Sequence, residues 1–440
     1  MVEHGAAHGK RSVSRRDFLG MSAGAVATGL AGGLSIARSA HAAGSDVLKI
    51  GLIGCGGRGS GAAVNAMNAD KNAKLVAMAD IFEDRVKNAR KQLQTERPAQ
   101  MAVDNDHSFV GFDAGYKVIA SGVDVVLIAC TSRFHPFFLK AAVDAGKHVF
   151  VEKPNAIDPP GVRLVAEACE EARKKNLSVV SGLCWRYDKG VQETMKRVLD
   201  GAIGEIVAVQ EIYMRAPYVL RERRPGDTEL QSQFRNWYHF NWLSGDDVPQ
   251  SLLHSMDKGC WALREETPKQ AYGLGGRSSC FGPVYGDVFD HCSIVYEYAN
   301  GVRMYAHVRA QAGCHDEVSD TFLGTKGRCY LLKHRIEGQT NWRYEGKPQA
   351  SMYDREHEAL FAAIRAGKPL NNGLYMVRST MVAVLGQMVC YNGQQMTWEQ
   401  VMASNYKAGP DKVSWDMTPP VKPEANGAYP VPVPGITKLG

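Results

Sequence analysis

VLKIGLIGCGGRG, residues 47–59, is the stretch of sequence that decides the fold. Its first part, 47–54, is a nearly continuous apolar run, which is typical of a strand buried on both faces of a parallel sheet. The glycines that follow fit the pattern G-x-G-x-x-G at Gly54, Gly56 and Gly59, and the run 62–69 predicts a helix after them. Glycines between a buried strand and a helix let a pyrophosphate approach the backbone amides at the positive end of that helix. The stretch therefore predicts a dinucleotide-binding βαβ unit.

The alternation of strand and helix continues as far as residue 183. Further strands are expected at 74–79, 123–129, 148–151 and 177–183, and further helices from Glu83 and at 114–120, 136–145 and 160–175. Right-handed crossovers between parallel strands place helices on both faces of such a sheet. The predicted fold class is therefore α/β, with an N-terminal Rossmann doubly wound parallel sheet.

The pattern changes after Arg186, where aromatic and strand-like segments replace the regular alternation. Strands are expected at 205–214, 292–298, 302–308 and 328–332, followed by amphipathic helices at 356–366 and 377–391. Asn300-Gly301 lies between two of these strands and predicts a type I′ hairpin, whose two central residues both need positive φ. This half is predicted to be an α+β domain with an open, mainly antiparallel sheet.

Four parts are expected along the chain. They are a leader at 1–43, a nucleotide-binding domain at 44–185, an α+β domain for substrate binding and oligomerisation at 186–415, and a Pro-rich tail at 416–440 that forms a surface strap. An open sheet face in the second domain suits a dimer or tetramer, so a homo-oligomer is expected.

The leader contains Ser14-Arg15-Arg16-Asp17-Phe18-Leu19, then a Gly/Ala-rich apolar stretch and Ala40-His41-Ala42. Small residues at alternate positions suit signal peptidase, and the whole resembles a twin-arginine export signal. A chance arginine pair and a permanent membrane anchor are the alternatives, and the many glycines disfavour the anchor. This resemblance implies a partner in the twin-arginine export machinery, a periplasmic or otherwise exported protein, and folding before export with any cofactor inside.

The composition of the chain narrows the kinds of partner and cofactor that are expected. The chain has 440 residues, 45% hydrophobic and 22% charged, and its formal charge of +6 includes the cationic leader but no later run of Lys and Arg. Nucleic acid is therefore not expected as a partner, nor is a stable membrane anchor. The ten cysteines form no C-x-x-C pair, so neither a metal site nor a disulfide framework is predicted.

An acidic residue stands where a nicotinamide dinucleotide needs one. Asp80 ends the second expected strand, 21 residues after Gly59, where a carboxylate can accept hydrogen bonds from the ribose 2′-OH and repel a 2′-phosphate. NAD is therefore favoured as cofactor, while Arg58 could hold a 2′-phosphate and leaves NADP open. The alternative interpretation of Asp80 is that it caps a helix in an α/β domain that binds no cofactor.

Glu152-Lys153-Pro154 follows an expected strand, at the carboxyl edge of the sheet where ligands of doubly wound folds bind. A surface lysine is an equally good interpretation of the spacing alone. However, the segment Gly146 to Pro154 resembles the hallmark strand of the Gfo/Idh/MocA oxidoreductases, the glucose-fructose oxidoreductase and inositol dehydrogenase type. This resemblance spans nearly all of the mature chain.

Other segments carry the same resemblance. Cys130 to His135 resembles the T-P-x-x-x-H loop of the family, with Ser132 in place of proline, and 182–187 and 356–369 resemble later family segments. The motif and the resemblance together predict a cofactor site of Gly54, Gly56, Gly57, Arg58, Gly59, Asp80, Thr131, His135, Glu152 and Lys153.

Gln250 to Asp257 matches the family segment that carries an acid/base histidine, which here is His254. The resemblance implies that His254 and Lys153 are the catalytic residues. Gln250 replaces an aspartate and cannot accept a proton, while Asp257 could orient the imidazole. A helix starting here would place 250, 254, 257 and 261 on one face, so a core-facing stripe is the alternative.

Polar and aromatic side chains around this segment suit a sugar cleft. The predicted substrate residues are Arg186, Tyr187, His239, Gln250 and Asp257, and Tyr213, Arg215, Arg235, Trp237 and Tyr238 could line the same cleft.

The leading hypothesis is hydride transfer between the carbinol carbon of a sugar or polyol and nicotinamide, with His254 taking the hydroxyl proton and Lys153 stabilising the alkoxide. An exported enzyme meets no expected pool of free nicotinamide, so the cofactor is expected to be bound tightly and regenerated in a redox-neutral cycle. One alternative is an NAD-dependent glycosidase or lyase acting through transient oxidation. The other is a non-catalytic dinucleotide-binding sensor.

Overall fold

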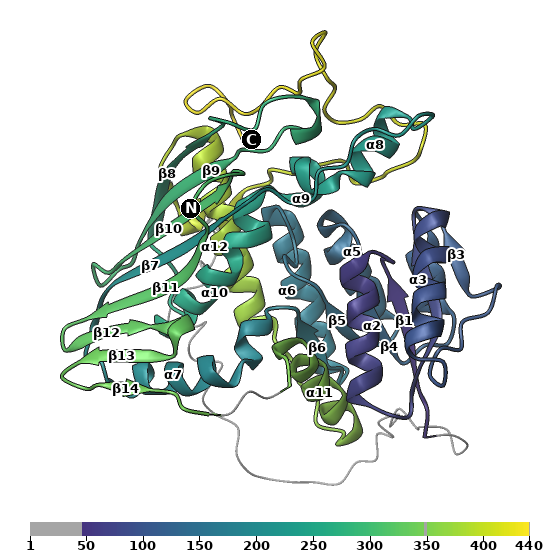
Figure 1. Cartoon of the computed structure of the whole chain (residues 1–440), viewed down its shortest axis with the longest axis horizontal. Coiled ribbons are helices and arrows are strands. Elements are labelled where there is room, and N and C mark those ends of the chain that lie inside the picture. The colour runs from purple at the N-terminus through teal and green to yellow at the C-terminus, as the bar shows by residue number, and fades with distance from the viewer. Residues whose placement is uncertain (1–45, 347–349, 440) are drawn as a thin grey trace, which may run out of the picture. The chain divides into compact units, whose positions relative to one another are not determined.

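The computed structural model describes residues 46–346 and 350–439. The predicted export leader lies outside the described residues. From Val47 on, the chain forms one compact unit that contains two sheets, called sheet A and sheet B below (Figure 1).

Sheet A is the predicted Rossmann sheet. Its six strands lie in the order β3-β2-β1-β4-β5-β6, and every pair is parallel. This order reverses direction between β1 and β4, the point at which doubly wound folds bind dinucleotides. The strands are β1 (Leu48–Ile53), β2 (Ala73–Asp80), β3 (Ser108–Val110), β4 (Val125–Ile128), β5 (His148–Val151) and β6 (Val179–Ser181).

Helices flank sheet A as the alternation of the sequence predicted. They are α2 (Gly57–Ala69), α3 (Glu83–Glu96), α4 (Ala114–Ala120), α5 (His135–Asp144) and α6 (Pro159–Lys174). The first helix begins at Gly57, inside the glycine motif, rather than at the expected residue 62. Glycine lowers helix propensity, so the sequence pattern placed the start too late.

Sheet B confirms the predicted α+β half. Its nine strands lie in the order β14-β13-β12-β11-β7-β10-β9-β8-β15, and all pairs are antiparallel except β7 with β10. The strands are β7 (Ile206–Arg215), β8 (Gln270–Gly276), β9 (His291–Glu297), β10 (Arg303–Ala310), β11 (Glu317–Gly324), β12 (Gly327–Tyr330), β13 (Arg335–Gly338), β14 (Trp342–Arg343) and β15 (Met396–Thr397). The second-half helices are α7 (Lys189–Leu199), α8 (Glu229–Arg235), α9 (Asn241–Ser244), α10 (Leu253–Ala262), α11 (Met352–Arg365), α12 (Gly373–Asn392) and α13 (Trp398–Ala403).

The hairpin at Asn300-Gly301 is present, but its predicted turn type is wrong. Strands β9 and β10 pair from Glu297 with Arg303, and Tyr298 and Val302 close the loop. Gly301 has a φ of 86°, whereas Asn300 is not among the residues with positive φ. The loop is longer than a two-residue turn, so one left-handed glycine suffices.

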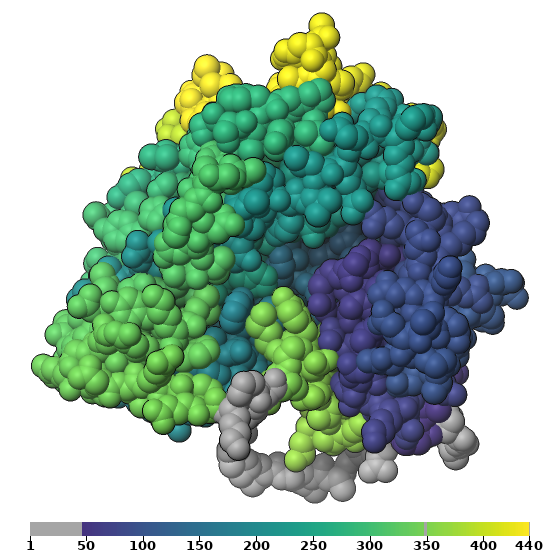
Figure 2. Space-filling model, viewed as in Figure 1, coloured from purple at the N-terminus to yellow at the C-terminus, as the bar shows by residue number. Residues whose placement is uncertain are grey.

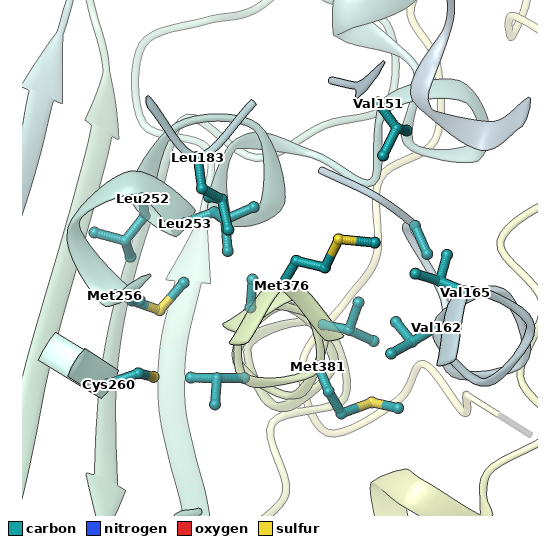
Figure 3. Close-up of a cluster of buried hydrophobic side chains, with 14 of the residues drawn as sticks. Val151, Val162, Val165, Leu183, Leu252, Leu253, Met256, Cys260, Met376 and Met381 are labelled. Carbon is teal, nitrogen blue, oxygen red and sulfur yellow. The ribbon is translucent and has the colours of Figure 1, made fainter. Parts of the chain in front are cut away.

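Helix α12 joins the two halves through one apolar core. It is the one helix among the described residues that is long and apolar enough to cross a membrane, and most of it is buried inside the protein. Figure 3 shows its Met376 and Met381 between two sets of apolar side chains, with Val162 and Val165 of α6 on one side and Leu253, Met256 and Cys260 of α10 on the other. The shared core fixes the edge of sheet A relative to α10.

Residues 404–439 contain no helix or strand. In Figure 1 this yellow segment runs from the region of sheet B to α8. Its anchored part lies against the dinucleotide groove, as described below.

Candidate active site

The glycine motif forms a tight turn in which no larger residue fits at Gly54 or Gly59. Gly54 has a φ of 100°, and a Cβ on Gly59 would lie 1.8 Å from the Gly54 carbonyl oxygen. Gly56 begins α2 without any side-chain cap, and the first turn has no acidic residue. Beside Gly57 a Cβ would meet nothing within 4 Å. The positive end of α2 is therefore open to an anion such as a pyrophosphate.

Asp80 lies at the end of β2 beside this turn. Its carboxylate accepts hydrogen bonds from the backbone amides of Cys55 at 2.8 Å and Phe82 at 3.0 Å. Burial raises the pKa of Asp80 and outweighs these amides, which lower it. The carboxylate is thus fixed in place by the two loops that flank the groove.

Two cavities meet at Asp80 and together form the candidate dinucleotide groove. One, of about 400 Å³, is lined by Gly54, Thr131 and several aromatic side chains. The other, of about 320 Å³, is lined by Gly56, Gly57 and residues of the 218–238 segment. In Figure 2 the surface is hollowed where purple residues of the first half face teal residues of the second. The open amides, the fixed carboxylate and the divided cavity fit a dinucleotide.

Arg58 lines the groove, but its guanidinium is engaged by two other side chains. Its guanidinium forms an ion pair with Glu152 at 2.6 Å and lies over the ring of Tyr353 in α11. This contact joins the glycine turn to the residue before Lys153. Arg85 in the first turn of α3 lines the same cavity, and the sequence motifs did not single it out.

His135 lies behind the groove rather than in it. Its Nδ1 lies 2.8 Å from the carbonyl oxygen of Pro154, and its Nε2 lies 2.9 Å from that of Cys130. Both ring nitrogens therefore face backbone, and the side chain is 1% exposed. His135 holds together the loops that carry Thr131, which lines the groove, and Lys153.

Lys153 reaches from sheet A to the second half of the chain. It follows β5, and its ammonium donates a 2.5 Å hydrogen bond to the backbone carbonyl of Gln250. The lysine is thus a link between the nucleotide-binding half and the segment that carries His254.

The side chain of Gln250 contacts Ser132, which also departs from the family pattern. Its amide nitrogen donates to the Ser132 hydroxyl at 2.9 Å and to the Ser244 carbonyl. Gln250 and Ser132, which stand where the family has aspartate and proline, therefore bond to each other across 118 residues. Gln250 presents its backbone oxygen to Lys153, and its side chain joins the two halves.

The helix expected around Gln250 differs from a regular one. Residues Val248–Leu252 form a π-helical turn before α10 begins at Leu253. The wider turn breaks the four-residue alignment of 250 with 254, so Gln250 faces Ser132 while His254 lies beside the ring of Tyr213. The predicted shared face is therefore wrong for Gln250, whereas 254, 257 and 261 lie within the regular helix α10.

Asp257 does not orient His254. Both of its oxygens accept from Arg186, at 2.9 and 2.8 Å, and one also accepts from the Ser379 hydroxyl. The Nδ1 of His254 has no hydrogen-bond partner among the described residues. The prediction of an Asp257–His254 pair is thus wrong, because the Arg186 fork occupies the carboxylate.

Three electrostatic effects keep His254 neutral. Burial lowers the pKa of His254 well below its usual value, and the positive charges of Lys153 and Lys258 lower it further. The Lys258 ammonium donates to the His254 backbone carbonyl and pairs with buried Asp320 at 3.3 Å. A neutral imidazole can accept a proton, as a general base must.

The remaining predicted substrate residues are Arg186, Tyr187 and His239, and they do not lie in one place. Arg186 also pairs with Glu265 at 2.7 Å and lies over Tyr375, so its guanidinium has no free edge. The Tyr187 hydroxyl donates to Asn372. His239 lines a small cavity with Arg215, and burial lowers the pKa of His239 to about 4. His239 therefore lies in a cavity wall.

A polar network lies beside Lys153, and the sequence motifs did not predict it. The Tyr218 hydroxyl lies 3.1 Å from Ser251 Oγ and 3.4 Å from the Gln250 carbonyl oxygen that Lys153 also contacts. Ser251 donates to Asp247, which pairs with Arg215. Tyr218 belongs to a loop without a recognisable pattern, so only the fold brings it to the groove.

The fold and the groove place this protein among those that join a Rossmann sheet with a dinucleotide groove to an α+β half. Residues 48–181 match the Gfo/Idh/MocA model, described as an oxidoreductase family with an NAD-binding Rossmann fold. The match covers the residues that form sheet A, and the prediction of NAD as cofactor is confirmed at this level.

Individual relatives match over different lengths. Inositol 2-dehydrogenase of Klebsiella pneumoniae strain 342 is 28% identical over 219 residues, which cover 50% of this chain and 55% of that protein. The chain thus spans about half the length of this curated relative.

Two solved structures show the same fold. The aldose-aldose oxidoreductase of Caulobacter crescentus, complexed with glycerol, has a TM-score of 0.61 at 16% identity, over 80% of this chain and 99% of that one. A levoglucosan dehydrogenase, in complex with NADH and levoglucosan, has a TM-score of 0.62 at 16% identity, over 80% and 99%.

Replacing Asp80 tests the groove directly. Asp80→Asn keeps the shape and removes the charge, and we expect NAD to bind about 10- to 100-fold more weakly, because hydrogen bonds to a charged acceptor are lost. The preference for NAD over NADP should narrow as well. Titration with both nucleotides measures the two effects. Asp113→Asn, in the wall of the same cavity, is the control, and an unchanged NAD to NADP ratio in Asp80→Asn would contradict this assignment.

Proposed function

We propose that this chain is an exported NAD-dependent oxidoreductase that transfers hydride between the carbinol carbon of a sugar or polyol and bound nicotinamide. The observation that carries the proposal is the meeting of Lys153, from the end of β5, with the Gln250 to His254 segment beside the dinucleotide groove. The inositol dehydrogenase relative and the levoglucosan complex support a polyol or sugar as substrate.

The residues of this chain have distinct tasks in that reaction. Neutral His254 accepts the proton of the substrate hydroxyl, because burial and two neighbouring cations disfavour its charged form. The Lys153 ammonium stabilises the negative charge that develops on the substrate oxygen. Tyr218 and the Gln250 carbonyl limit where that oxygen can lie. Nicotinamide, when bound, supplies the hydride chemistry.

Export and a redox-neutral cycle complete the proposal. The Arg15-Arg16 leader motivates export, and a cofactor carried outside must be regenerated in place. Either one sugar is oxidised and a second carbonyl compound is reduced, or one substrate is oxidised and re-reduced around an elimination. The aldose-aldose oxidoreductase neighbour favours the first form.

A homo-oligomer formed through sheet B is the proposed assembly. Helices α10 and α12 cover one face of the sheet, while Ile212, Val295 and Tyr305 are half-buried side chains on its other face. Half-buried apolar residues on an open sheet face suit contact with a second copy, which native mass measurement tests.

The cofactor content of the purified mature protein tests the closed cycle. We expect denaturation to release close to one nicotinamide per chain, because only slowly dissociating NAD can travel with an exported protein. Absorbance and mass spectrometry of the supernatant measure it, and a sugar panel read by product mass follows. Glycoside cleavage without net absorbance change would replace the dehydrogenase by the lyase alternative. A protein that purifies empty and needs millimolar added NAD would contradict the closed cycle.

A further inference from the structure

The segment after α13 is held against the nucleotide domain by a buried ion pair. Arg133, which is 3% exposed, pairs with Asp158 at 2.7 Å and donates to the carbonyl oxygens of Gly409 and Pro410. Asp158 in turn accepts from the backbone amide of Ala408 at 3.0 Å. Charge-assisted hydrogen bonds of this kind are about twice as strong as neutral ones. They make the first anchor of the segment.

Trp415 makes a second anchor a few residues later. Its ring lies 4.6 Å from that of Phe112, 5.6 Å from that of Phe82 and 5.7 Å from that of Phe234. Phe82 follows β2 and Phe112 follows β3, so both belong to the rim of the dinucleotide groove. Residues 408–415 therefore bridge this rim between two fixed points, and we call them the C-terminal strap.

Between the anchors the strap forms part of a cavity wall. Asp411, Lys412 and Val413 line the 400 Å³ cavity together with Gly54 and Asp80. The rest of the wall is largely aromatic, contributed by Phe112, Tyr116, Phe134, Phe137, Phe138 and Phe234. A flat base between aromatic and apolar walls, with a carboxylate placed for ribose hydroxyls, is the environment that adenosine requires.

We propose that the C-terminal strap forms the outer wall of the adenosine subsite and retains the dinucleotide, which leaves only after an anchor opens. The proposal rests on the NAD-binding function proposed above and adds residues from outside the Rossmann domain to the site. A wall that must open before release slows dissociation without adding a contact to the reacting end. This retention is what an exported protein with a captive cofactor needs.

The test compares dissociation rates in the full mature protein. NADH is first bound to the wild type and to Trp415→Ala, Trp415→Phe and Val433→Ala. Excess NAD then displaces it, and the fall in NADH fluorescence gives the dissociation rate. We expect Trp415→Ala to release NADH at least about ten-fold faster, because three aromatic contacts are lost. Trp415→Phe keeps a ring and should change the rate much less. Val433, exposed beyond the strap, is the matched control and should leave the rate unchanged.

A second measurement does not depend on a variant that must fold. Limited proteolysis of the wild type should cleave within 408–415 more slowly when NAD is present than when it is absent. Equal release rates in wild type and Trp415→Ala, or cleavage unaffected by NAD, would overturn the strap. If the wild type binds no NADH at all, the proposed function fails instead, so the two failures are distinguishable.

Discussion

Lys153→Ala is expected to lower kcat by about 10²- to 10³-fold, because an ammonium that stabilises a developing alkoxide is lost. NADH affinity should stay within a few-fold of wild type, since the groove is built from the glycine turn and Asp80. Steady-state kinetics on the best substrate of the sugar panel and fluorescence titration measure the two quantities.

A control on the same strand separates charge from location. Lys147 immediately precedes β5, at the end opposite Lys153, and is half-exposed, so Lys147→Ala should leave kcat unchanged. Lys153→Arg keeps a cation of different shape and should recover only part of the rate. Turnover of Lys153→Ala within a few-fold of wild type would remove Lys153 from the reaction centre.

His254→Ala is expected to lower kcat by about 10²- to 10⁴-fold, because the general base is lost. Burial, Lys153 and Lys258 all lower the pKa of His254, so the imidazole stays neutral at a pH where an ordinary histidine would already take up a proton. A base acts in its deprotonated form, and the acidic limb of the wild-type oxidation profile should therefore lie at lower pH than the ordinary pKa of histidine would give. A pH series of kcat measures it.

The residual activity of Lys153→Ala offers a linked measurement. Removing one of the two cations that lower the pKa of His254 should move the acidic limb to higher pH. His307→Ala is the control, because His307 contacts Ser293 in sheet B, and its kinetics should match the wild type. An acidic limb that stays in place in Lys153→Ala, or a His254→Ala variant with near wild-type turnover, would sink the assignment of His254.

The competing hypotheses predict different results from the same variants. A non-catalytic sensor would bind NAD and show no turnover in the wild type. A wild-type glycosidase or lyase would form product without a net change in nicotinamide absorbance. Both variants of such an enzyme would lose product formation. Lys153 donates to the backbone carbonyl of Gln250, so this contact needs no carboxylate at position 250.

The nucleotide domain could be predicted from sequence because its signals are local. An apolar strand, a glycine turn and a helix lie within residues 47–69, and the acidic residue ends the next strand. Chain direction alone then places Asp80 and Lys153 at the carboxyl edge of a parallel sheet. The cofactor class follows from these short-range patterns, and the candidate site is proposed from them.

The tertiary structure alone decided how the second half of the site is arranged. The π-helical turn at Val248–Leu252 changes which side chains share a face, and no hydrophobic period records it. The bond between Gln250 and Ser132, the capture of Asp257 by Arg186 and the cavity wall shared by Val413 and Gly54 all join residues far apart in sequence. Periodicity and spacing describe neighbours along the chain, whereas these contacts depend on how α10, α12 and the last segment pack against sheet A.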